Sequence, residues 1–160
     1  MSESYRVRVS KEQFSFCSGH FISYEGSKCE RLHGHNYRVQ VEITGPLDEN
    51  WYVFDFIALK NLTKAITDDL DHRMMLPLRN PFIHVTLAGQ QVNVTYQTRH
   101  WSFPLEDCVL LPIENTTAEQ LACYIAVKLR KLLLENYHFA PSHMTVEVEE
   151  TPGQSAFYEM

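Results

Sequence analysis

The feature that most constrains this chain is an alternation of apolar and polar side chains over residues 36–44. The apolar positions are Tyr37, Val39, Val41 and Ile43, and the polar ones between and after them are Arg38, Gln40, Glu42 and Thr44. This pattern predicts a β-strand with one buried and one solvated face, because successive strand side chains point to opposite faces. The apolar face of such a strand must be covered by a second layer of structure.

Two further segments alternate in the same way and are expected to lie in the same sheet. They are Tyr5–Val9 near the start of the chain and Met144–Glu149 near its end. Phe157–Tyr158 is expected to add a short strand, and Trp51–Phe54 is a candidate for a return to the sheet.

Two other segments carry apolar residues at helical spacing and are expected to form the covering layer. The first follows Asp55, a good N-cap, and has its stripe at Leu59, Leu62, Ile66 and Leu70. The second begins at Thr116 or Thr117, each of which fits a capping box with Glu119 or Gln120. Its stripe is Leu121, Ile125, Leu129, Leu132 and Leu133.

Between these helices, residues 82–110 are predicted to form a β-hairpin with strands at 83–87 and 92–96. The order of elements is therefore strand, strand, helix, hairpin, helix, strand. It indicates an α+β fold in which two helices cover one face of an antiparallel sheet, within one domain over residues 1–160.

Composition excludes several classes of protein. With 14 basic and 20 acidic residues, the formal net charge is −6, which argues against a general nucleic-acid binder. No apolar run approaches the roughly 18 residues that a membrane span requires. Met1–Val9 has no apolar signal core, so we expect a cytoplasmic protein whose four cysteines are reduced.

The densest chemical segment runs from Cys17 to His35. His33 and His35 are two apart at the start of the predicted strand, so both imidazoles are expected to point to one face. His20 is the natural third ligand of a zinc site that keeps one coordination position open. The alternative to a metal site is a pair of surface histidines at a sheet edge.

Cysteines near these histidines allow a competing interpretation. Cys17 with His20 and Cys29 with His33 have the spacing of a closed Cys2His2 zinc site, which would be purely structural. Otherwise Cys29 is either an inert buried thiol or, with positive charge and a metal nearby to favour its thiolate, a general base.

Two carboxylates are further candidates. Asp71 could orient the ring of His72 as an acid–base pair, or His72 could simply interact with the dipole of the helix that ends there. Glu150 has the apolar parity of its strand and would then face inward and need a hydrogen-bond donor, such as the N–H groups of a flat heterocycle. Alternatively the strand has ended and Glu150 is exposed.

Six motifs in order resemble the 6-pyruvoyl-tetrahydropterin synthase and 6-carboxytetrahydropterin synthase family. They cover almost the whole chain outside residues 82–110 and lie at residues 14–20, 29–37, 55–60, 70–72, 114–119 and 148–151. The resemblance implies the tunnelling fold, with a four-stranded antiparallel sheet, two helices on one face, and subunits joined into a barrel. It further implies a homohexamer made of two trimers, with active sites at the subunit contacts.

The same resemblance implies a zinc-dependent lyase that acts on a pterin, 7,8-dihydroneopterin triphosphate. Zinc would be bound by His20, His33 and His35, with Cys29 as general base working with Asp71 and His72. Glu150 would anchor the pterin, and Thr116, Thr117 and Glu119 resemble the segment that reaches a neighbouring pterin pocket.

In the short spacing from His20 to His33 and in the run Arg31–His35, the chain resembles more closely the bacterial branch that forms 6-carboxy-5,6,7,8-tetrahydropterin with loss of acetaldehyde and triphosphate. That product leads to deazaguanines, as in queuosine biosynthesis. Triphosphate elimination to the pyruvoyl product of tetrahydrobiopterin biosynthesis is the alternative, and a non-catalytic pterin-binding or structural zinc protein is a third. Residues 82–110 depart from compact family members as an extra hairpin.

Overall fold

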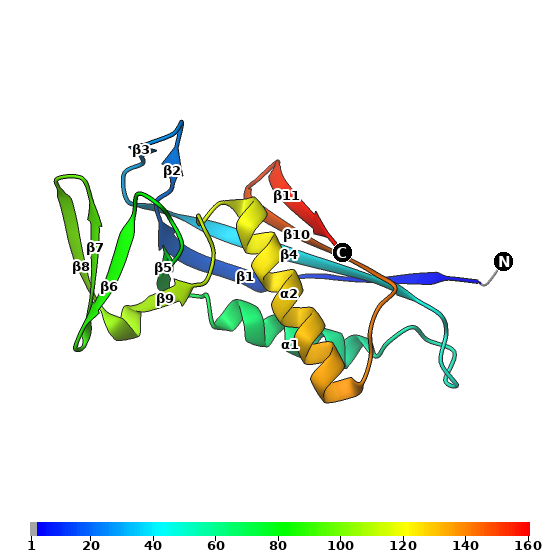
Figure 1. Ribbon diagram of the computed structural model, residues 1–160. Coiled ribbons are helices and arrows are strands. Elements are labelled where there is room, and N and C mark those ends of the chain that lie inside the picture. The colour runs from blue at the N-terminus through cyan, green and yellow to red at the C-terminus, as the bar shows by residue number, and fades with distance from the viewer. Residues whose placement is uncertain (1–2) are drawn as a thin grey trace.

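The computed structural model describes residues 3–160 and shows an α+β fold. Helices α1 (Phe56–Asp68) and α2 (Ala118–Tyr137) pack on the same face of a six-stranded main sheet with the order β11-β10-β4-β1-β5-β9 (Figure 1). The strands of this sheet are β1 (Tyr5–His20), β4 (His33–Gly45), β5 (Arg73–Pro77), β9 (Cys108–Leu111), β10 (His143–Thr151) and β11 (Gln154–Glu159). The predicted α+β class and the two covering helices are confirmed.

The main core lies between the sheet and these helices. All four apolar positions of the β4 alternation are at most 2% exposed, as are the three of β10, which pairs with β4. Both helix stripes meet them, with Leu62 and Leu132 only partly buried at the edges. Burying each such aliphatic side chain stabilises the fold by roughly 1.5–3 kcal/mol. The core residues from the strands and helices are Tyr37, Val39, Val41, Ile43, Met144, Val146, Val148, Leu59, Ile66, Leu70, Leu121, Ile125, Leu129 and Leu133.

The helix starts agree with the capping signals. The Asp55 carboxylate accepts hydrogen bonds from the backbone N–H groups of Ile57 and Ala58, at 2.6 and 2.9 Å. At α2 the N-cap is Thr117, whose hydroxyl accepts from the N–H of Gln120. Each cap satisfies N–H groups that have no partner inside the helix.

Strand β1 extends far beyond the predicted Tyr5–Val9. Its pairing with β4 shifts register between Ser10 and Ser15, because four residues of β1 lie between these two, whereas only Val39 lies between their partners Gln40 and Arg38. This irregularity changes the parity of the buried face from Val9 to Phe14. The single alternation expected from the sequence therefore stops at residue 9, because a bulge reverses which residues face the core.

Two other expectations about the sheet are wrong. Trp51–Phe54 is a turn in which Trp51 has a φ of 64° and is 82% exposed. The main sheet is also not purely antiparallel, because β5 pairs in parallel with β1, and β9 in parallel with β5. Residues Met74–Pro77 are buried without interruption, as is usual for a parallel strand, so they offer no alternation to detect.

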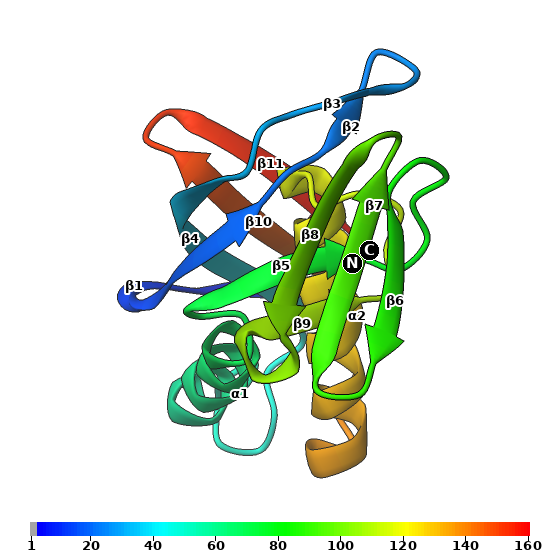
Figure 2. The same ribbon diagram turned by 90° about the vertical axis from the view of Figure 1, so that its left-hand side faces the viewer.

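The hairpin within residues 82–110 is present and carries a third strand. Strands β6 (His84–Ala88), β7 (Gln91–Tyr96) and β8 (Arg99–Pro104) form a separate antiparallel sheet at one end of the molecule (Figure 2), and a 3-10 turn at Leu105–Asp107 leads from it into β9. A small hairpin of β2 (Ser23–Tyr24) and β3 (Lys28–Cys29) lies beside it. Among residues 3–160, no helix combines the length and apolar character needed to cross a bilayer.

Candidate metal centre and active site

Three histidines meet where β1 ends and β4 begins. His20 is the direct partner of His33 across the β1–β4 pair, and His35 lies two residues further along β4. One ring nitrogen from each lies within 4.8 Å of the other two. The predicted triad is therefore brought together, and its third member depends on the bulge in β1, which places His20 on the core face.

Hydrogen bonds on the far side of two rings fix which nitrogen faces the cluster. The Nδ1 of His20 donates to the Thr116 carbonyl at 2.9 Å, and the Nδ1 of His33 donates to the Arg31 carbonyl at 2.8 Å. A carbonyl can only accept, so both Nδ1 atoms carry a proton, and Nε2 is the nitrogen of each neutral ring that can bind a metal. The Tyr37 hydroxyl lies 3.3 Å from Nε2 of His20. Burial, together with the neighbouring His33 and His35, lowers the pKa of His20 to about 4 despite the bond to Thr116. The His20 ring is therefore neutral at physiological pH and can bind a metal through Nε2.

This set of donors fits a zinc ion. Three imidazoles on paired strands leave one tetrahedral position open, which is the arrangement of catalytic rather than structural zinc sites. Cys17 does not join these ligands, because its side chain is exposed and points to the face of β1 opposite to that of His20. Among the described residues the metal-binding group contains no cysteine, which argues against the closed Cys2His2 site.

Glu150 faces inward beside the histidines, as its strand parity predicts. Its Oε1 lies 3.7 Å from Nε2 of His20 and 3.8 Å from Nε2 of His35, and it accepts a 3.4 Å hydrogen bond from the Tyr37 hydroxyl. Burial and the Glu150 carboxylate raise the pKa of Tyr37, so this hydroxyl stays a donor. The carboxylate is 26% exposed and can accept further bonds from a ligand.

Cys29 ends β3 close to this cluster in the chain, and its thiol lies 3.5 Å from the Glu30 carbonyl. Burial raises the pKa of the thiol, and the guanidinium of Arg99 only partly opposes that effect. The expected lowering by adjacent basic residues is therefore not found without a metal. Lys28 is engaged with Glu25 instead.

Glu30 lies at the site although the sequence patterns did not predict it there. Its Oε2 lies 3.9 Å from Nε2 of His33 and accepts a bond from the Ile22 N–H. The only sequence signal was its place directly after Cys29 and three residues before His33.

Asp71 and His72 form the predicted pair at the end of α1. The Asp71 carboxylate lies 2.8 Å from Nδ1 of His72 and accepts from the Cys17 N–H at 2.7 Å. Although desolvation opposes it, these bonds hold the pKa of Asp71 below its usual value. His72 has a φ of 56° and its side chain is 83% exposed. It lines a cavity of about 420 Å³ together with His33.

Within residues 3–160, no hydrogen bond or ion pair joins Cys29 to Asp71 or His72. At the start of α2, Thr116 is fully buried against His20, Thr117 caps the helix, and Glu119 is exposed in the first turn. The first of these residues thus supports a proposed metal ligand directly.

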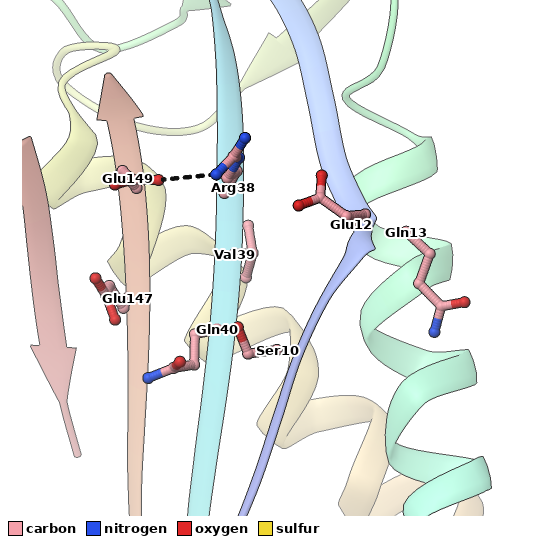
Figure 3. Close-up of a pocket in the computed structure, with 8 residues that line it drawn as sticks. All are labelled: Ser10, Glu12, Gln13, Arg38, Val39, Gln40, Glu147 and Glu149. Carbon is pink, nitrogen blue, oxygen red and sulfur yellow. Dashed lines mark ion pairs between the residues drawn. The ribbon is translucent and has the colours of Figure 1, made fainter. Parts of the chain in front are cut away.

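A larger cavity, of about 720 Å³, lies on the opposite, polar face of the sheet (Figure 3). It contains none of the predicted site residues. Arg38 and Glu149 line it and form an ion pair at 4.0 Å, which the figure marks. The histidines and the residues that line this cavity lie on different faces of the sheet, because successive side chains of a strand point to opposite faces.

Comparison with known proteins shows the family to which the chain belongs. Residues 8–160 match the family model described as 6-pyruvoyl tetrahydropterin synthase. A putative 6-carboxy-5,6,7,8-tetrahydropterin synthase of Methanocaldococcus jannaschii is 34% identical over 148 residues, covering 89% of this chain and 88% of the relative. The 6-carboxy-5,6,7,8-tetrahydropterin synthase of Haemophilus influenzae is 40% identical over 129 residues, covering 77% and 82%.

Among solved structures, a Plasmodium vivax 6-pyruvoyltetrahydropterin synthase carrying a substitution of a catalytic glutamate superimposes with a TM-score of 0.90. The two chains share 29% identity, and the match covers 99% of each. A match of that extent includes residues 82–110, so the sheet of β6, β7 and β8 is not peculiar to this chain. The chain therefore belongs to the 6-pyruvoyl tetrahydropterin synthase family and is a lyase of the tetrahydropterin synthase type.

Proposed function

We propose that the protein is a zinc-dependent lyase that converts 7,8-dihydroneopterin triphosphate to 6-carboxy-5,6,7,8-tetrahydropterin, with release of acetaldehyde and triphosphate. The single observation that carries the proposal is the convergence of His20, His33 and His35, with Nε2 as the nitrogen of His20 and His33 that can bind a metal. The names of the relatives in M. jannaschii and H. influenzae support the carboxy product.

Zinc bound by the three histidines would act as a Lewis acid that acidifies the side-chain hydroxyls of the substrate and stabilises negative charge on their oxygens. Glu150 would accept hydrogen bonds from the amino and ring N–H groups of the pterin. A carboxylate binds two parallel N–H donors well, and here only the Tyr37 hydroxyl donates to it among the described residues.

Proton transfer requires a group on either side of the substrate side chain. We assign Cys29 as the proton acceptor on one side and the Asp71–His72 pair on the other, with Asp71 holding the ring of His72. Glu30, which lies 3.9 Å from His33, is a second proton acceptor in this proposal. A glutamate is also a catalytic residue in the P. vivax relative.

Because no hydrogen bond or ion pair within the described chain joins Cys29 to the Asp71–His72 pair, we propose that neighbouring subunits of a hexamer, a dimer of trimers, complete the site. In that assembly Thr117 and Glu119 would reach the pterin held by the next subunit, whereas Thr116 acts through His20. Light scattering would show the hexamer mass, and a monomer mass would remove the basis for shared sites.

The deciding experiment is incubation of the zinc-loaded protein with 7,8-dihydroneopterin triphosphate, followed by mass spectrometry of the products. Acetaldehyde with a carboxypterin supports the proposed reaction and a place in deazaguanine synthesis. A pyruvoyl product would instead indicate the second candidate function, that of a 6-pyruvoyl synthase. This candidate is supported by the similarity to the P. vivax 6-pyruvoyltetrahydropterin synthase, with its TM-score of 0.90.

Two variants separate catalysis from metal binding. We expect Cys29→Ala to keep zinc and lose turnover, and His35→Ala to lose zinc. Pterin binding that depends on Glu150 with no product under any condition would instead indicate a pterin-binding protein without turnover. The four free cysteines are consistent with the cytoplasm as the proposed compartment.

A further inference from the structure

We propose that Arg99, on β8 of the separate three-stranded sheet, is a positioning residue that sets the place of Cys29 and Glu30 beside the metal centre. The inference rests on the proposed function, because it concerns the two groups assigned there as proton acceptors. It also gives residues 82–110 a role in that reaction.

The Arg99 guanidinium makes a bidentate contact with the main chain. Arg99 Nη2 donates to the Cys29 carbonyl at 2.8 Å, and Nη1 donates to the Glu30 carbonyl at 3.0 Å. The guanidinium group is planar and rigid, so binding two successive carbonyls fixes the orientation of the peptide units that follow Cys29 and Glu30. Cys29 is the last residue of β3, where it pairs with Ser23, and the Glu30 N–H donates to the Ile22 carbonyl at 3.0 Å. In the described chain, residues 31 and 32 then lead to the first histidine of β4 outside any strand.

The guanidinium itself is held in place. Its central carbon lies 4.9 Å from the ring centre of Tyr96 and 5.2 Å from that of Trp101, so aromatic rings from β7 and β8 flank it. Cation–π contacts of this kind limit where the group can move. A residue that is immobilised by its own sheet can impose its geometry on the segment that it binds.

The same sheet also holds the other parts of this segment. Phe21, which directly follows His20, stacks on Trp101 with ring centres 4.6 Å apart. The Tyr96 hydroxyl donates to the Ser27 carbonyl. The Cys29 side chain packs against a buried apolar cluster, separate from the main core, that contains Phe21 and Tyr96. The chain that leaves β1 after His20 and returns at His33 is thus held by the three-stranded sheet at Phe21, Ser27, Cys29 and Glu30. Figure 2 shows β2 and β3 next to one end of this sheet.

Direct binding of the substrate triphosphate by Arg99 is a less fitting role. Both terminal nitrogens already donate to carbonyls, and the side chain is half-buried between rings. Displacing a proton acceptor by about 1 Å can lower a rate about 10²-fold while leaving substrate binding little changed. Loss of Arg99 should therefore lower kcat far more than it raises KM.

The test compares Arg99→Gln, Arg99→Lys and Arg99→Ala with Arg130→Gln, which removes the same charge from the exposed side of α2. We expect full zinc content in all four. We expect kcat to fall about 10²-fold in Arg99→Gln with KM within about threefold of wild type, and partial recovery in Arg99→Lys. Millimolar guanidinium, but not equal sodium chloride, should restore part of kcat in Arg99→Ala. Arg130→Gln should behave as wild type.

A substrate-free measurement keeps this inference separate from the proposed reaction. Hydrogen exchange of the zinc-loaded protein, read by mass spectrometry, should be faster in Arg99→Gln than in wild type for peptides covering residues 22–32, and unchanged for β4. If wild type shows no turnover but this local change occurs, the proposed reaction fails and the positioning stands. Unchanged exchange, unchanged kcat, or a rise in KM alone would overturn the positioning role.

Discussion

Burial of His20 should make the stability of the metal-free protein depend on pH in a way that one substitution removes. The imidazole is 2% exposed and its pKa is lowered to about 4, whereas an unfolded histidine titrates near 6.5. Between these values the unfolded chain binds a proton that the folded protein does not. The contribution is therefore fully present above pH 6.5 and is lost as the pH falls toward 4.

The size of the effect follows from these two pKa values. A single site with this shift loses about 2 kcal/mol of unfolding free energy between pH 7 and pH 5. That is a large fraction of the 5–15 kcal/mol that stabilises a typical domain. Most other groups titrate alike in both proteins being compared, so the difference between wild type and variant isolates His20.

The assay is urea unfolding of metal-free protein at pH 7 and pH 5, at one fixed subunit concentration, for wild type, His20→Gln and His143→Gln. Glutamine can still donate to the Thr116 carbonyl but does not titrate. His143 is exposed and serves as the matched control. We expect wild type and His143→Gln to lose about 2 kcal/mol more than His20→Gln. Equal losses in all three proteins would refute the reasoning.

Other perturbations test the supports of the site and fold. A Cβ at residue 34 would stand 2.9 Å from the Ser18 carbonyl, so Gly34→Ala should push β4 from β1 between two proposed ligands and weaken zinc binding about 10-fold or more, measured by chelator competition. Asp55→Ala should cost about 1–2 kcal/mol in urea unfolding through loss of the α1 cap, and Asp55→Asn much less. Lys128→Ala, which breaks an ion pair whose side chains are 33% (Lys128) and 62% (Asp69) exposed, should cost about 1 kcal/mol or less in urea unfolding; a larger loss would contradict the screening of this pair by solvent.

Expectations from the sequence held best where neighbouring residues determine the outcome. The alternation over residues 36–44 predicted β4, and the capping residues Asp55 and Thr117 predicted the starts of both helices. Expectations failed where distant packing decides. Met74–Pro77 is covered on both sides by other elements, so a fully buried parallel strand shows no period-two pattern.

For the site, the sequence by itself determined that His33 and His35 share a face, because alternation along one strand needs no other part of the chain. Only the tertiary structure decided that His20 faces them, since a bulge of β1 sets its direction. It also decided that Thr116, 96 residues away, orients that ring, and that Arg99 holds the segment bearing Cys29. Local spacing fixes where nearby side chains point, whereas contacts between distant segments depend on the packing of the whole fold.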